Sequence, residues 1–145
     1  MSVYADSSFL FSYYSSDANS TRADAWRQLH PDPLPLSAVH CLELHNAFEL
    51  AVFQNRISST QAKDLWHQIE HDLTATLLTD VTIILSELFD RAESLAELHT
   101  AQTGARSLDI LHVASAQMLA AEEIVTFDIR QAALSARVGL RVAVL

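Results

Sequence analysis

Apolar residues recur every three or four positions along several segments of the chain, a pattern typical of helices that bury one face. A clear example begins near Ala38, where Leu44, Phe48 and Ala51 share one side of a helical projection. The same periodicity, together with capping residues, predicts helices over residues 7–14, 20–29, 38–55, 58–76, 81–101, 108–121 and 128–137. Gly139 is expected to end the last of them, because glycine readily adopts the left-handed conformation that stops a helix.

Short apolar segments between the helices predict β-strands. They cover residues 2–5, 34–36, 123–127 and 140–145. Strands that alternate with helices favour a parallel sheet with helices on both faces. The segment 108–121 is apolar on nearly all sides, so we expect its helix to lie deep against the sheet. The predicted fold class is α/β: a single domain over residues 1–145, with a central parallel sheet of four to five short strands flanked by helices on both faces.

The composition agrees with one folded domain. The chain has 145 residues, of which 50% are hydrophobic and 19% charged, so it can bury a core of ordinary size. No apolar run approaches the roughly 18 residues of a membrane-spanning helix, and the first residues lack the basic start and the cleavage site of a signal peptide. The single cysteine, Cys41, excludes an internal disulfide. We therefore expect a cytoplasmic protein with no membrane contact.

Four carboxylates are expected at one edge of the predicted sheet, where ligands of parallel α/β sheets bind. Asp6 and Asp128 directly follow predicted strands. Glu43 lies in the opening turns of the helix after the second strand, and Asp109 lies in the first turn of the buried helix. Three of them also have a structural interpretation, as helix caps or as charges at a positive helix end. Glu43 is harder to explain in that way, because it borders an apolar stripe where an unpaired carboxylate is costly.

Carboxylates that meet at one place repel one another, which raises some of their pKa values. A divalent cation can neutralise such a cluster, and a site made only of oxygen ligands suits Mg²⁺ or Mn²⁺. A cation held in this way lowers the pKa of bound water and stabilises in-line attack on phosphorus. The chemistry that fits the four acids is therefore hydrolysis of phosphodiester bonds.

Four segments of the chain resemble PIN-domain ribonucleases, and in particular the VapC-like toxins of bacterial toxin–antitoxin pairs. The segments are VYADSSFL, LPLSAVHCLELHNAF, RSLDILHVASA and IVTFDIRQAALSARVGLRV. The resemblance implies a metal-dependent endoribonuclease with Mg²⁺ or Mn²⁺ as cofactor, an RNA substrate, an antitoxin protein as partner, and a homodimer. The residues implied for the metal site are Asp6, Glu43, Asp109 and Asp128, with supporting hydroxyl groups from Ser8 and Thr126.

The net charge of −9 argues against a protein that holds RNA by bulk positive charge. Contact with a substrate phosphate would instead rest on the cation and on local arginines, for which Arg130 and then Arg106 are the candidates. The alternatives are a non-catalytic PIN-like scaffold and another α/β metal-dependent phosphohydrolase. The segment from His67 to His71 also matches the zinc-binding pattern H-x-x-E-H, although a polar helix face is the better explanation.

Overall fold

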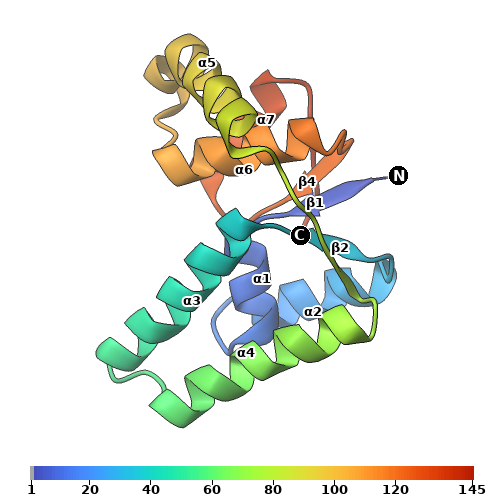
Figure 1. Ribbon diagram of the computed structural model, residues 1–145, viewed down its shortest axis with the longest axis vertical. Helices are drawn as coiled ribbons and strands as arrows, with labels where there is room; N and C mark the ends of the chain where they lie inside the picture. Colours follow the sequence, from blue (N-terminus) through green and yellow to red (C-terminus); the bar gives the residue numbers. More distant parts are fainter. Residues whose placement is uncertain (1) are drawn as a thin grey trace.

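The computed structural model describes residues 2–145. The elements of this part of the chain are β1 (Val3–Ala5), α1 (Ser7–Tyr14), α2 (Ser20–Leu29), β2 (Leu34–Leu36), α3 (Ala38–Phe53), α4 (Ser59–Thr74), β3 (Leu78–Asp80), α5 (Leu85–Thr103), α6 (Ser107–Met118), β4 (Glu123–Val125), α7 (Ile129–Arg137) and β5 (Arg141–Val142). Figure 1 shows α5, α6 and α7 on one side of the strands and α1 to α4 on the other. No helix within residues 2–145 is both long and apolar enough to cross a membrane.

The sheet β1–β4–β5 separates two hydrophobic cores. All of its strands pair in parallel, in the spatial order β1, β4, β5. Successive side chains of a strand point to opposite faces of a sheet. Accordingly Tyr4 and Ile124 belong to the core under α5, α6 and α7, whereas Ala5 and Val125 belong to the core formed with α1 to α4. Both faces of the sheet are therefore buried, as the apolar sequence of its strands requires.

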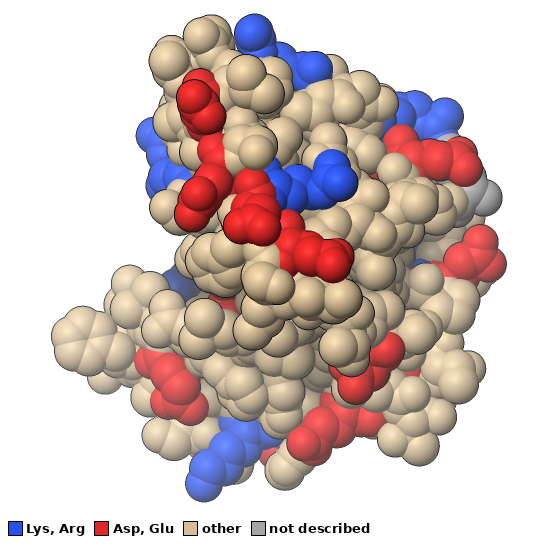
Figure 2. All heavy atoms as spheres, turned by 45° about the horizontal axis from the view of Figure 1, so that its top comes forward, with Lys and Arg blue, Asp and Glu red and all other residues tan. Residues whose placement is uncertain are grey.

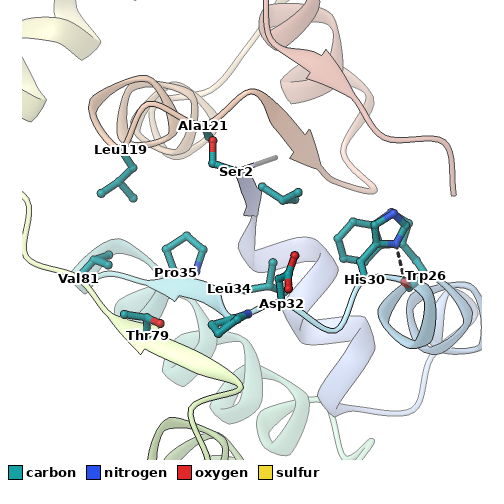
Figure 3. A pocket seen from close by; sticks show the side chains of 12 residues that line it. Ser2, Trp26, His30, Asp32, Leu34, Pro35, Thr79, Val81, Leu119 and Ala121 are labelled. Carbon is teal, nitrogen blue, oxygen red and sulfur yellow. Dashed lines mark hydrogen bonds between the residues drawn. The ribbon is translucent and has the colours of Figure 1, made fainter.

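Strands β2 and β3 form a second, two-stranded parallel sheet beside β1. Leu34 donates its N–H to the carbonyl of Leu77 (3.2 Å), and the Leu36 carbonyl accepts from the N–H of Val81 (2.9 Å). These two backbone groups of β2 therefore point toward β3 and away from β1. The intervening Pro35 faces β1, and it has no N–H to donate to a ladder. A hollow of about 440 Å³ lies here, lined among others by Val3 of β1 and Pro35 of β2 (Figure 3).

The predicted α/β class, with parallel strands and helices on both sides, is confirmed. The predicted single sheet of four to five strands is wrong, because the strands of residues 2–145 form one sheet of three strands and a separate sheet of two. The strand β3 is not among the predicted ones, because its three residues are too short for a periodic signal. Predicted bounds differ elsewhere for identifiable reasons. The helix expected from residue 81 begins at Leu85, since the backbone of Val81 still bonds to β2. The last strand covers only Arg141–Val142, and α6 ends at Met118 because Ala120 takes a left-handed φ of 52°.

Candidate active site

The four predicted acids line one cavity of about 310 Å³ at the carboxyl ends of β1 and β4. They are Asp6, Glu43, Asp109 and Asp128. Each comes from a different segment. Asp6 directly follows β1, and Asp128 lies three residues after the end of its partner strand β4. Glu43 lies in the second turn of α3, and Asp109 lies in the first turn of α6. Helix α3 packs beside both α1 and α6 (Figure 1), which closes the distance between segments far apart in the chain.

Asp6 is the most deeply buried of the four acids, with 2% of its surface exposed. Its carboxylate accepts hydrogen bonds from the backbone N–H of Phe9 (2.9 Å), from the hydroxyl of Thr126 (2.6 Å) and from the hydroxyl of Ser8 (2.8 and 2.9 Å to its two oxygens). Burial raises the pKa of this carboxyl, while the charge of His112 and the three hydrogen bonds act in the opposite direction. Asp6 is thus both the cap of α1 and a carboxylate that would gain stability from a nearby cation.

Glu43 reaches the cavity from α3 and contacts Nε2 of His112. Burial acts to raise the pKa of Glu43, but the hydrogen bond and the charge of His112 outweigh burial, so that its pKa lies below the usual value. The other ring nitrogen of His112, Nδ1, lies 2.7 Å from the hydroxyl of Tyr4. Nε2 also lies 3.1 Å from the hydroxyl of Ser7. The carboxylate of Glu43 is therefore tied to the first strand and the first helix through one histidine.

The guanidinium group of Arg106 lies between the other two acids. Its Nε is 3.2 Å from Asp109, and a terminal nitrogen is 2.8 Å from Asp128. The hydrogen bond to Asp109 and the charges of Asp109 and Asp128 raise the pKa of Arg106. Asp109 also accepts from the backbone N–H of Arg106 (2.8 Å), and Asp128 accepts from the first N–H groups of α7. Both acids are thereby held at the starts of helices, and both carboxylates line the cavity.

The donor set has the chemistry that a hard divalent cation prefers, because all four acids offer carboxylate oxygens. No group of three or more His, Cys, Asp or Glu side chains in the described part of the chain is close enough to surround one ion. A cation here would be held by one or two carboxylates and would keep several waters, which is the usual binding mode of Mg²⁺ in proteins. The residues present therefore fit a hydrated Mg²⁺ or Mn²⁺ and do not form a closed metal cage.

The supporting residues expected from the sequence have distinct positions. Ser8 and Thr126 both bond to Asp6 and lie 3.3 Å from each other. Arg106 lines the cavity, whereas Arg130 is exposed on α7 and is not among the lining residues. The helix cap expected at Ser107 is instead Arg106, one residue earlier, because Asp109 accepts the Arg106 N–H.

Other polar residues that line the cavity include Asp17, His112 and Gln131. Asp17 adds a fifth carboxylate at the rim, where it accepts from Ser12 (2.7 Å). His112 follows Asp109 by one helical turn; this spacing allows contact with the acids, although the sequence favours a place in the core or at its rim, and the structure puts His112 in the cavity lining. Gln131 is 1% exposed, and its side-chain nitrogen has no hydrogen-bond partner within the described residues, so it is a free donor next to Asp128.

Other hollows within residues 2–145 are lined by fewer acids. The hollow of Figure 3 opens at the amino end of β1, and Asp32 is the one acidic residue in its lining. His67, Glu70 and His71 are exposed on α4, at a distance from the cavity lining. The acidic residues number 18 against 9 basic ones, and they lie on the upper, middle and lower parts of the face in Figure 2. Acidic side chains are therefore spread over this face of the molecule.

Comparison with known proteins agrees with the fold. The sequence profile of the PIN domain family matches residues 3–136. The structure of VapC20 from Mycobacterium tuberculosis, described as a toxin that cleaves the sarcin–ricin loop, is similar over 91% of this chain and 94% of that chain, with 18% sequence identity and a TM-score of 0.67. FitAcB from Neisseria gonorrhoeae is similar over 97% and 95%, with 17% identity and a TM-score of 0.65. A comparison with curated protein sequences gives no significant match.

The two solved structures are too distant in sequence to show more than the fold. The family profile, in contrast, spans almost the whole chain, from β1 to the end of α7. The segments it covers include all the elements that carry the acids of the cavity. The chain therefore belongs to the PIN domain family, whose members are nucleases.

Proposed function

We propose that this protein is a Mg²⁺- or Mn²⁺-dependent endoribonuclease that hydrolyses RNA phosphodiester bonds. One observation carries the proposal: Asp6, Glu43, Asp109 and Asp128 come from four separate segments and line one cavity. A protein without a use for this charge would gain stability by losing it, because carboxylates brought together repel one another. A purely structural cap explains each acid singly but not their convergence.

The proposed metal site consists of Asp6, Glu43, Asp109 and Asp128, of which one or two would bind the cation directly and the others would contact its waters. A divalent cation bound there would supply positive charge opposite the phosphodiester and would activate water for attack on phosphorus. Ser8 and Thr126 fix the orientation of Asp6 by hydrogen bonds of 2.6–2.9 Å.

Arg106 is the proposed local contact for a substrate phosphate, because it is the arginine that lines the cavity. Its guanidinium group is bidentate by geometry and is 63% exposed, so it can donate to an incoming phosphate. Arg130, exposed two residues after Asp128, is proposed as a second contact farther along the RNA. RNA binding would accordingly depend on a few local cations in a protein with a net charge of −9.

A role as the toxin of a toxin–antitoxin pair is also proposed. It is supported by the sequence resemblance to VapC-like toxins and by the similar fold of VapC20. An acidic cavity suits the arginine-bearing tail of an antitoxin, since arginine pairs with carboxylates. Apolar side chains exposed on α3, such as Leu42 and Phe53, are available for contact with an antitoxin or with a second copy in a homodimer, and the proposed location is the cytoplasm.

The test is cleavage of a structured RNA with Mg²⁺, with Mn²⁺ and with a chelator. We expect cleavage only with metal, and a loss of at least about 100-fold in Asp6→Asn and Asp109→Asn, the range seen when a group that stabilises the transition state is removed. Asparagine retains an oxygen that can accept the capping N–H groups of both residues, so the fold should survive. Asp24→Asn, an exposed acid on α2 outside the cavity, is the matched control.

Intact RNA under all metal conditions, with wild-type folding, would contradict the proposal and favour the scaffold. Preferential cleavage of DNA or of a phosphomonoester would indicate a different phosphohydrolase at the same site. The toxin role is tested separately by expression in a bacterial host. Growth should slow with the wild type and recover with Asp6→Asn, and equal growth of the two strains would contradict it.

A further inference from the structure

We propose that Tyr4 and His112 form a positioning pair that holds the Glu43 carboxylate in the cavity. This inference rests on the proposed function. It adds two residues that are not acids and that act on the site through Glu43. Neither residue is a proposed metal ligand or substrate contact. Their role is to set where a ligand oxygen lies.

The hydrogen-bond pattern defines the direction of the contact. The carboxylate of Glu43 can only accept hydrogen bonds. Nε2 of His112, which faces it, therefore carries a proton. Nδ1 is left to the hydroxyl of Tyr4 at 2.7 Å. Tyr4 therefore fixes the orientation of the ring through the nitrogen that does not face Glu43.

The surroundings make this orientation rigid. Tyr4 is fully buried and His112 is 2% exposed, whereas the Glu43 side chain is 23% exposed at the cavity. The Tyr4 ring packs against His40 and His112 at centroid distances of 4.9 and 5.8 Å. His40 in turn bonds to the carbonyl of Ala5 (2.8 Å), next to Asp6. A flexible glutamate side chain is thus tied to a buried cluster that cannot rearrange easily.

Such a tie matters for a ligand on a long side chain. Glutamate loses rotamer entropy whenever its carboxylate is held in one place, and a pre-formed contact removes that cost from the binding step. Residues that hold a metal ligand in this way commonly change metal affinity 10- to 100-fold when they are replaced. A histidine that served only the core would have no need to face a carboxylate.

The experiment compares Tyr4→Phe with Tyr14→Phe. Both tyrosines are buried, and each hydroxyl makes a side-chain hydrogen bond of 2.7 Å, Tyr14 to Asp72 outside the cavity. The two variants therefore remove the same atom from similar surroundings. Mn²⁺ affinity, measured by calorimetry without RNA, should fall about 10-fold in Tyr4→Phe and stay unchanged in Tyr14→Phe. With RNA and saturating Mn²⁺, kcat should fall in Tyr4→Phe while KM for RNA stays constant.

Two further variants test the path through the histidine. His112→Gln keeps an N–H donor that can reach Glu43, so it should retain more Mn²⁺ affinity than His112→Leu. In a Glu43→Gln background, Tyr4→Phe should cause no further loss, because its effect is exerted through Glu43. Both comparisons use the metal-binding readout, and folding of every variant is checked by its urea unfolding midpoint.

The outcomes separate the inference from the proposed function. If the wild type binds Mn²⁺ and Asp109→Asn does not, but Tyr4→Phe matches Tyr14→Phe, the positioning role is wrong and the nuclease proposal stands. If the wild type neither binds Mn²⁺ nor cleaves RNA, both are wrong. Equal affinity in the glutamine and leucine variants of His112, or a further loss from Tyr4→Phe without Glu43, also overturns the positioning role.

Discussion

Replacement of Arg106 by glutamine should strengthen the binding of a divalent cation and weaken the binding of RNA. The guanidinium group pairs with Asp109 at 3.2 Å and with Asp128 at 2.8 Å, so a cation that uses either carboxylate must compete with it. The Arg106 side chain is 63% exposed, and exposed ion pairs contribute about 0.2–1 kcal/mol each. A total of about 1 kcal/mol corresponds to a roughly fivefold lower Kd for Mn²⁺.

Calorimetric titration of the free protein with Mn²⁺ measures this change directly. Arg130→Gln is the matched control, because it removes the same charge from an exposed arginine that does not line the cavity. If Arg130→Gln tightens Mn²⁺ binding as much as Arg106→Gln, the effect is one of net charge only. Unchanged or weaker Mn²⁺ binding in Arg106→Gln would refute the competition. The KM for RNA should rise in Arg106→Gln, since a phosphate contact is lost.

Three predictions concern stability. Burial and the charge of His112 lower the pKa of His40 to about 3; the unfolded chain then binds a proton near pH 6.5 that the folded chain does not, so the free energy of unfolding should fall by about 2 kcal/mol from pH 7 to pH 5. Urea titrations at the two pH values should show this difference reduced in His40→Gln, and parallel losses would contradict it. Thr126→Val should cost about 1–3 kcal/mol, because it removes the donor to Asp6 and the acceptor of the Asp128 N–H (2.9 Å); an unchanged urea midpoint would show that water replaces the hydroxyl. Gly104→Ala should cost about 1 kcal/mol, because its φ of 65° is left-handed although a Cβ meets no atom within 4 Å, and a stabilised variant would disprove that explanation.

Much of the fold follows from local patterns in the sequence. The stripe of Leu44, Phe48 and Ala51 predicts α3, and all three are buried there. The glycine at position 139 has the expected left-handed φ, 84°. Local patterns do not predict β3, which has only three residues and forms by pairing with β2. They also place the start of α5 too early, because the N–H of Val81 bonds to the carbonyl of Leu36 in β2.

The acidic site was likewise predictable in part from the sequence, and in part decided by the tertiary structure. That Asp6 and Asp128 follow apolar strand segments can be seen in the sequence, because a strand and the residue after it are neighbours in the chain. That Arg106 lies between two of the acids, and that His112 faces Glu43 across 69 positions, is decided by the packing of α3 against α6. The sequence alone determined which side chains could carry the chemistry and near which strand ends. Only the tertiary structure decided which charges they meet, because contacts between distant segments depend on how the helices pack and not on local periodicity.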